Sequence, residues 1–137
     1  MRCLAIAVAL LIAAPITLAA KPMWEISDRW ICEVRSHVKM QTDGSNVRVN
    51  EESNTQVLDF AAGTISTGFT DLSGAIGKKT YHESRYGSFN VLDIFWDGEP
   101  YPKVIVEKNG EWWETAGSGH ADDDRTIWIA NYQCTPA

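Results

Sequence analysis

The sequence predicts an all-β protein, a small antiparallel up-and-down β-barrel of about eight strands that is closed by one disulfide. Apolar residues recur at every second position in several short stretches, as in half-buried strands. Beyond residue 20, no stretch keeps the helical repeat of about 3.6 residues, and turn-forming residues interrupt the chain at short intervals. A two-sheet β-sandwich is the alternative, because it uses the same kind of strand.

Length and charge restrict the chain to one domain and exclude one class of partner. Its 137 residues leave room for a single core, and the hydrophobic fraction of 45% excludes wholesale disorder. Lys and Arg number 12 against 18 Asp and Glu, which gives a net charge of −6. Nucleic-acid binding needs a basic stripe, so we expect no nucleic-acid partner.

Residues 1–20 have the three-part layout of a secretory signal peptide. Arg2 precedes an apolar run over residues 4–14, Pro15 ends any helix, and the small residues Ala19 and Ala20 follow. The run is shorter than the ~20 residues needed to span a bilayer. We expect cleavage after Ala19 or Ala20, and a single domain over residues 21–137 with no transmembrane segment. The mature protein is then periplasmic or secreted.

The expected mature chain keeps two cysteines, Cys32 and Cys134, one near each end. In an oxidising compartment such a pair predicts one disulfide, and two buried free thiols are the alternative. The two positions are 102 residues apart. Closing a loop of that size stabilises the fold by about 4–5 kcal/mol in the chain-entropy model. If the first and last strands are neighbours, the sheet closes on itself.

The clearest strand covers residues 29–40. Its alternation places Trp30, Cys32, Val34, Val38 and Met40 on one face, and Ile31, Glu33, Arg35, His37 and Lys39 on the other. We therefore expect His37 to be exposed. The last strand, residues 125–134, places Thr126, Trp128, Ala130, Tyr132 and Cys134 on one side.

The remaining strands are shorter. They are expected at residues 47–51, 56–60, 64–69, 80–86, 89–96, 103–107 and 112–116. Gly87-Ser88 and Asn109-Gly110 are predicted hairpin turns, the second being the strongest turn signal in the chain. Loops are expected at residues 70–79, 97–102 and 117–124, where Gly, Pro or polar residues gather.

Six tryptophans are the most informative feature for function. Trp112 and Trp113 are adjacent, so in a strand they point to opposite faces and one lies outside the core. Exposed aromatic side chains can stack on a sugar or on an apolar patch of a partner. Long loops at residues 68–79 and 97–102 are the expected recognition surfaces. The candidate binding residues are Ser73, Tyr81, Trp96, Tyr101, Trp112 and Trp113.

Catalytic and metal motifs are absent from the sequence. There is no G-x-S-x-G or H-E-x-x-H pattern and no phosphate-binding glycine loop. His82 has Glu83 and Ser84 beside it, but a triad is assembled in space rather than along the chain. The acidic residues 122–124 after His120 read as a solvated turn, since their spacing does not match a calcium loop. We expect no enzyme, no cofactor and no metal.

The layout resembles exported bacterial β-barrels with one cysteine near each end, such as the periplasmic inhibitors of c-type lysozyme. The motif of that family is Ser-Gly, two residues, then Tyr. Here Ser73-Gly74 is followed by Ala75, Ile76 and then Gly77 in place of the Tyr. The lipocalin-like carriers are a second architectural analogue. Their G-x-W motif is missing, because Asp28-Arg29 precedes Trp30.

These observations predict an exported, non-catalytic binding protein that recognises a protein or a cell-envelope component, such as an envelope glycan, through loops and exposed aromatic residues. A lipocalin-like carrier of a small apolar ligand and a lysozyme-inhibitor-like protein are the alternatives. A carrier needs a cavity behind Trp30, Val34 and Trp128, whereas a surface binder needs a packed interior and exposed aromatic residues. An enzyme needs a polar cleft with a perturbed histidine or acid.

Overall fold

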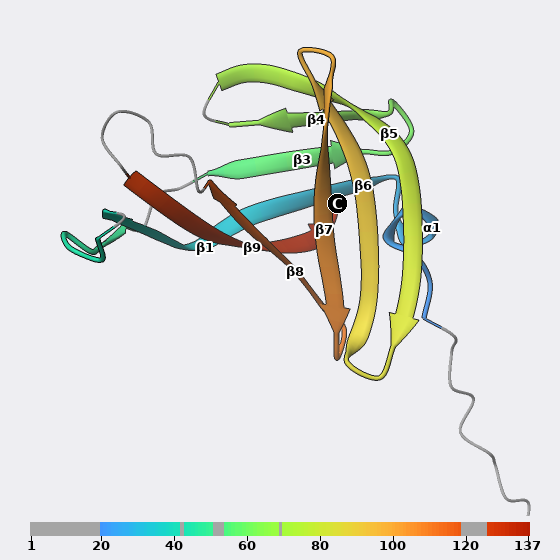
Figure 1. The fold of residues 1–137 in the computed structure, drawn as a ribbon. Helices are drawn as coiled ribbons and strands as arrows, with labels where there is room; N and C mark the ends of the chain where they lie inside the picture. Colours follow the sequence, from blue (N-terminus) through green and yellow to red (C-terminus); the bar gives the residue numbers. More distant parts are fainter. Residues whose placement is uncertain (1–19, 42, 51–53, 69, 119–125) are drawn as a thin grey trace, which may run out of the picture.

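The computed structural model of the chain is a closed antiparallel barrel of eight strands with one additional short strand (Figure 1). The structure describes residues 20–41, 43–50, 54–68, 70–118 and 126–137. Its elements are α1 (Met23–Ile26), β1 (Arg29–Gln41), β2 (Arg48–Asn50), β3 (Thr55–Asp59), β4 (Thr64–Thr67), β5 (Thr70–Ser84), β6 (Gly87–Trp96), β7 (Glu99–Lys108), β8 (Glu111–Ser118) and β9 (Thr126–Pro136). The predicted barrel is confirmed, and the chain is not a two-sheet sandwich.

The barrel closes where the first strand meets the last. Strand β1 pairs with β9 along almost its whole length, from Trp30 opposite Pro136 to Gln41 opposite Thr126. The other edge of β1 pairs with β3 near its start and with the short β2 near its end. Every other strand from β3 onward pairs with its neighbour in the chain. Because the sheet returns to itself, its main strands have partners on both sides, which protects them from edge pairing.

The predicted disulfide is confirmed and lies at this seam. Cys32 is directly opposite Cys134, and the two sulfur atoms are bonded at 2.04 Å. Both side chains are buried inside the barrel. The alternative of two free thiols is therefore wrong. The covalent link holds together the two strands that are farthest apart in the sequence.

A bulge in β1 corrects one sequence prediction. The register of β1 against β9 shifts between Val34 and Ser36, so Arg35 is an extra residue. One extra residue reverses the faces of the remaining strand. His37 therefore points inward and is only 6% exposed, although simple alternation predicts an exposed side chain. Val38 faces outward for the same reason.

Two predicted loops are strands instead. Residues 70–79 form the first two-thirds of β5, with a register shift between Ile76 and Lys79. Residues 99–102 begin β7, in spite of Pro100 and Pro102. This part of β7 pairs with β6, and β8 joins it only from Ile105 onward in the described chain. Prolines are tolerated there because no ladder hydrogen bond is required on the open edge.

The hairpin turns follow the glycine and asparagine signals closely. Asn109 and Gly110 both have positive φ and connect β7 to β8, as predicted. The turn between β5 and β6 lies at residues 85–86, two positions earlier than predicted, and Gly87 begins β6. The predicted loop at 117–124 overlaps β8, which extends to Ser118, and its last six residues lie outside the described residues.

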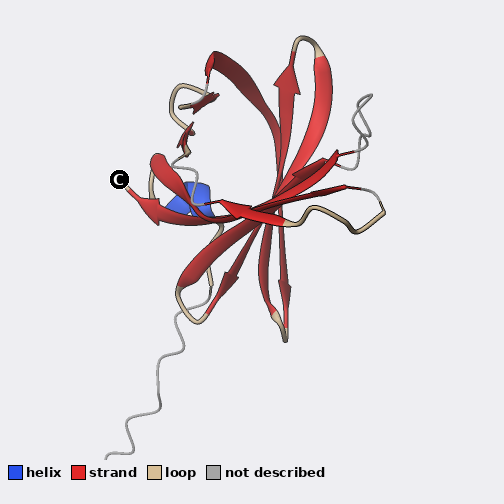
Figure 2. Cartoon of the chain, turned by 90° about the vertical axis from the view of Figure 1, so that its left-hand side faces the viewer, coloured by secondary structure: helices blue, strands red, loops and turns tan. Residues whose placement is uncertain are grey.

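The middle of the barrel is packed with large apolar side chains. Trp30 and Trp112 lie against each other with ring centroids 4.9 Å apart. The other buried apolar residues are Met23, Cys32, Leu58, Ile65, Leu92, Ile94, Ile105, Ala130, Tyr132 and Cys134. The short helix α1, which the sequence pattern did not predict, covers one end of this core (Figure 2). The Met23 amide donates to Asn90 Oδ1 at 2.9 Å, and the Trp30 indole donates to the Met23 carbonyl at 3.0 Å.

Candidate functional site

The barrel end opposite α1 carries a pocket of about 280 Å³, which we call the mouth pocket. Its lining residues are Val34, His37, Lys39, Asn54, Trp128, Ala130 and Tyr132. Three of them come from β1 and three from β9, so the seam that holds the disulfide also builds the pocket. This arrangement places the site on a covalently closed part of the fold.

The β1 bulge decides which side chains enter the pocket. Beyond the bulge, His37 lies opposite Ala130 and Lys39 opposite Trp128, so all four side chains share the inner face. The His37 and Trp128 rings are 6.0 Å apart between centroids. Without the extra residue, Val38 and Met40 would line this position in place of His37 and Lys39, and the pocket would lose two of its polar side chains.

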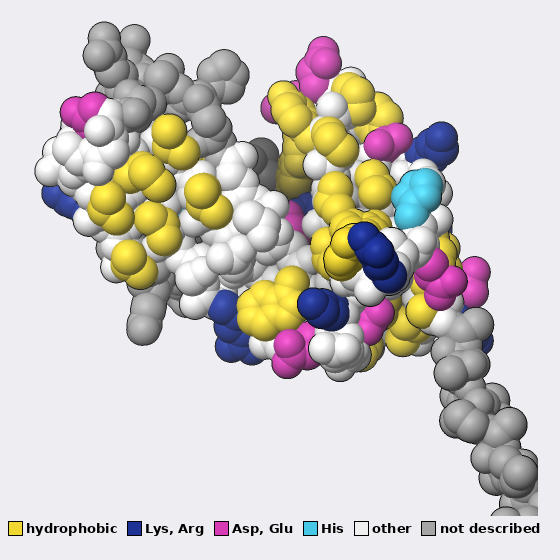
Figure 3. Space-filling model, turned by 60° about the horizontal axis from the view of Figure 1, so that its bottom comes forward, with side chains coloured by type: hydrophobic (Ala, Val, Ile, Leu, Met, Phe, Trp, Pro, Cys, Tyr) yellow, Lys and Arg dark blue, Asp and Glu magenta, His cyan; other side chains and the backbone are white. Residues whose placement is uncertain are grey.

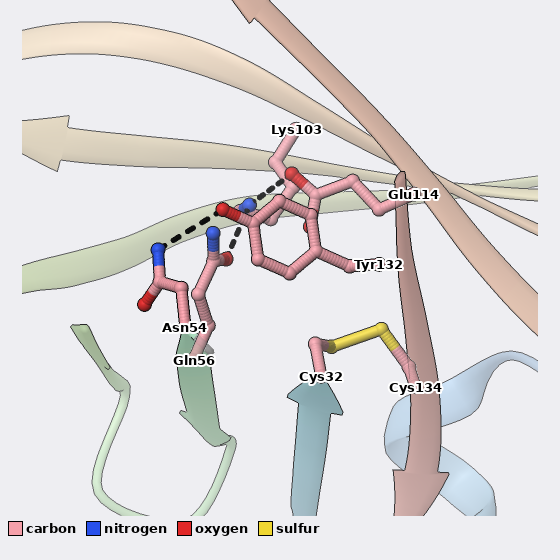
Figure 4. A network of polar contacts seen from close by, with 7 residues as sticks. All are labelled: Cys32, Asn54, Gln56, Lys103, Glu114, Tyr132 and Cys134. Atoms are coloured by element: carbon pink, nitrogen blue, oxygen red, sulfur yellow. Dashed lines mark hydrogen bonds and ion pairs between the residues drawn. A yellow bond between two sulfur atoms is a disulfide. The ribbon is translucent and has the colours of Figure 1, made fainter. Parts of the chain in front are cut away.

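A network of polar side chains lies beneath the mouth (Figure 4). Asn54 Nδ2 donates to the Tyr132 hydroxyl at 3.1 Å. Lys103 Nζ donates to Gln56 Oε1 at 2.8 Å and forms an ion pair with Glu114. The two charged side chains are 11% and 4% exposed, so this is a buried ion pair inside a small barrel. Burial of two charges is tolerated only when they are paired and hydrogen-bonded.

Two acceptors of this network lack a donor. Glu114 Oε2 and Asn54 Oδ1 are buried and have no hydrogen-bond partner among the described residues. Buried acceptors in native proteins are normally satisfied by protein, water or ligand. The mouth side of the barrel therefore holds unused hydrogen-bonding capacity, and no such atom is found in the apolar core of the described residues.

A second hollow, of about 390 Å³, lies near α1 and has two carboxylates and two serines in its lining. Its lining residues are Ala20, Glu83, Ser84, Gly87, Ser88 and Glu107. Tyr81 Oη donates to Glu83 Oε1 at 3.4 Å. Burial raises the pKa of the Tyr81 hydroxyl, and the negative charges of Glu83 and Glu107 raise it further.

The predicted binding residues do not converge on one site. Trp96 is half-buried toward the mouth end and packs over Gly74, where a Cβ would lie 3.0 Å from its ring. Tyr101 is 56% exposed near the same end, and Ser73 is exposed on β5. Tyr81 lies at the opposite end of the barrel, beside the hollow near α1.

The tryptophan pair behaves as its adjacency predicts. Trp112 is in the core against Trp30, so its side chain is not presented to a ligand. Trp113 is half-buried on the outer face of β8, where its indole donates to Glu111 Oε2 at 3.3 Å. Of this pair, only Trp113 is accessible from outside the barrel.

Sequence reasoning missed most of the mouth pocket. The alternation of β9 places Trp128 and Tyr132 on the inner face and could have indicated them. His37 and Lys39 were assigned to the outer face because the bulge has no signature in the sequence. Asn54 lies just before β3, outside the expected strands, and no feature of the local sequence indicates that it lines a pocket.

An apolar patch covers the outer face of β2, β1 and β9, and hydrophobic side chains gather over this part in Figure 3. Val38 lies opposite both Val49 on β2 and Ile129 on β9. Val49 is 72% exposed. The same bulge that turns His37 inward turns Val38 outward, so the mouth pocket and the outer patch have one cause.

Metal and membrane features are not seen in the part of the chain that the structure describes. It contains no group of three His, Cys, Asp or Glu side chains arranged to hold a metal ion. None of its helices has the length and apolar character needed to cross a bilayer. His120 and residues 122–124 lie outside the described residues.

Comparisons of the chain with protein-family models, curated proteins and solved structures find no match.

Proposed function

We propose that the protein is an exported, non-catalytic binding protein that holds a neutral sugar ring of an envelope glycan in the mouth pocket. The disulfide supports export, because such bonds persist in oxidising compartments. The missing catalytic motifs support a role in binding.

The observation that carries the proposal is the composition of the mouth pocket. Trp128 offers an aromatic ring and Val34 and Ala130 are apolar. The polar lining residues are His37, Lys39, Asn54 and Tyr132. A sugar ring combines one apolar face with hydroxyl groups at its edge, so it matches an aromatic platform with polar neighbours. The volume of about 280 Å³ is near the lower limit of small-molecule pockets, which suits one ring rather than a lipid.

The packed interior argues against a carrier of an apolar ligand. Trp30, Leu58 and Leu92 are fully buried in the region where such a carrier would need empty space. Binding at the mouth requires no such space. The proposal therefore assigns the ligand to the end of the barrel and a structural role to its middle.

A titration tests the proposal. Isotopically labelled, disulfide-bonded protein is titrated with N-acetylglucosamine and with its soluble oligomers, and amide and indole shifts are followed by NMR. We expect saturable shifts confined to β1 residues 34–39, Asn54 and the Trp128 indole. Trp128→Leu should weaken binding by about 5- to 30-fold, since loss of one stacked ring removes ~1–2 kcal/mol.

Trp113→Leu is the matched control, because Trp113 is a half-buried tryptophan on the outer face of the same barrel. It should leave the titration unchanged. Absence of saturable shifts, or loss of binding in Trp113→Leu with retention in Trp128→Leu, would contradict the mouth pocket as the glycan site.

A protein partner on the outer apolar patch is the second candidate function. Val49, Val38 and Ile129 form a contiguous apolar surface across three strands, and exposed patches of this kind often mark protein interfaces. Val49→Lys should then abolish binding of a co-purified periplasmic protein and leave the sugar titration unchanged. Retention of that protein by Val49→Lys would exclude the patch.

A further inference from the structure

We infer that the chain is cut between Ala19 and Ala20 and that the new α-ammonium group of Ala20 binds between the carboxylates of Glu83 and Glu107. This inference rests on the export that the proposed function assumes, but it concerns the α1 end of the barrel and not the mouth pocket. Removal of residues 1–19 would then create the ammonium group that fills the hollow at this end of the barrel.

The two carboxylates belong to one row of side chains across three neighbouring strands. Glu83 on β5 lies opposite Ser88 on β6, and Ser88 lies opposite Glu107 on β7. Residues directly opposite each other project to the same face of a sheet. Ser88 is 2% exposed and lies on the inner face, Glu107 is half-buried beside it, and Glu83 is exposed at the open end of the row. The row forms one wall of the hollow near α1.

The negative charge of this row is not balanced by a side-chain cation. Glu107 accepts hydrogen bonds from the Ser88 hydroxyl at 3.3 Å and the Gly110 amide at 2.6 Å. Glu83 accepts one from Tyr81. All three donors are neutral, and no lysine or arginine within the described ranges forms an ion pair with either glutamate. Both charges raise the pKa of Tyr81, which is consistent with their sharing one small volume.

The main chain reaches this hollow from α1. The Met23 amide is held by Asn90, which lies two residues along β6 from Ser88 on the same face. Three residues before Met23, Ala20 itself lines the hollow together with both glutamates. A cut after Ala19 places an ammonium group at this residue, and a charge-assisted hydrogen bond to a carboxylate is the strongest contact available there.

The position of the cut follows from the same geometry. Lys21 does not line the hollow, so an ammonium group created by a cut after Ala20 would lie one residue farther from the glutamates. Thr17 and Ala19 also provide the small residues that a signal peptidase reads before its cleavage site. The structure thus selects one of the two cuts that the sequence allows.

The first experiment is N-terminal sequencing and intact-mass measurement of the protein exported from cells expressing the full chain. Ala20 is the expected first residue. Lys21 as the first residue, or a chain that keeps residues 1–19, would overturn the inference. This readout is independent of any ligand, so its outcome is separate from that of the sugar titration.

The second experiment is a thermodynamic cycle on the exported protein. One form begins at Ala20, and the other has a Gly-Ser extension that moves the ammonium group away. Each is prepared with wild-type glutamates and with Glu83→Gln plus Glu107→Gln. The extension should lower the Tm by about 2–5 °C in the wild-type background and have no effect in the double variant.

The controls separate the ammonium group from other charges. Lys21→Gln removes the neighbouring side-chain cation and should leave the effect of the extension intact. Glu99→Gln removes an exposed carboxylate at the mouth end and should also leave the effect of the extension on the Tm intact. An equal loss of Tm on extension in both glutamate backgrounds would show that the carboxylates do not bind the ammonium group.

Discussion

The two ends of this barrel are filled by different kinds of side chain. At the α1 end, Met23 and Trp30 fill the opening and are tied together by a hydrogen bond from indole to carbonyl. At the mouth end, the inner face carries His37, Asn54 and the buried pair of Lys103 and Glu114. The first end gains stability from apolar burial beside the hollow of Glu83 and Glu107, whereas the second leaves an aromatic and polar pocket that is open to a ligand.

The comparison teaches that stability and binding are separated along the axis of the barrel. The strands are continuous between the ends, so the difference arises from side chains and from one bulge rather than from the topology. Substitutions near α1 should therefore affect unfolding, and substitutions of the side chains that line the mouth pocket should affect binding. Loss of one partner of the buried ion pair beneath the pocket should affect unfolding. The following predictions, from the largest effect to the smallest, test this separation.

The largest loss of stability should come from the seam that both ends share. Cys32→Ser removes the disulfide, whose loop of 102 residues contributes about 4–5 kcal/mol in the chain-entropy model. Urea unfolding with and without reductant measures the effect. Wild-type protein in reductant should approach the variant, and equal stability of oxidised wild type and variant would refute this role.

The buried ion pair at the mouth end should be almost as sensitive to the loss of one partner. Lys103→Met leaves the Glu114 carboxylate buried without its cation and should cost about 3–5 kcal/mol. Lys103→Met combined with Glu114→Leu removes both charges and should recover most of that loss. Chemical denaturation of the three proteins measures the coupling, and additive losses would show that the charges do not stabilise each other.

Matched truncations at the two ends test the separation directly. Met23→Ala opens a cavity under α1 and should lower the free energy of unfolding by about 2–4 kcal/mol. Trp128→Leu, at the half-exposed mouth, should lower it by less than about 1.5 kcal/mol. A Trp128→Leu protein that is less stable than the Met23→Ala protein would contradict the proposed division of roles.

The smallest effect concerns alkaline pH at the α1 end. The pKa of Tyr81 is raised in the folded state, so the protonated phenol is favoured by folding. This stabilisation is present below the ordinary tyrosine pKa of about 10 and is lost as the pH rises through the folded value. Tyr81→Phe should flatten the decline of stability between about pH 9 and 11. Tyr101→Phe is the control, because Tyr101 is exposed at the other end of the barrel, and it should leave this decline unchanged.

The barrel and its disulfide could be predicted because they depend on local alternation and on two cysteines. The inner face of β9, with Trp128, Tyr132 and Cys134, follows the two-residue period without interruption, and its prediction is confirmed. The turn at Asn109 and Gly110 is confirmed because positive φ is a local property of these residue types.

The predictions that are wrong concern segments whose conformation is set by a distant strand rather than by the preferences of their own residues. Gly74 and Gly77 indicate a loop when read alone, but in β5 they leave space for Trp96 and Phe95 to pack across the sheet. Pro102 indicates a break, but it lies in a part of β7 that β8 does not reach. Neither neighbour is visible in the local sequence.

The sequence by itself determined the all-β architecture, because strand periodicity and turn chemistry are encoded residue by residue. It also determined which two cysteines could join, since the expected mature chain has no others. Only the tertiary structure decided which side chains line the mouth. That choice depends on the extra residue at Arg35, and the bulge is a property of the pairing between β1 and β9, two strands that are far apart in the sequence.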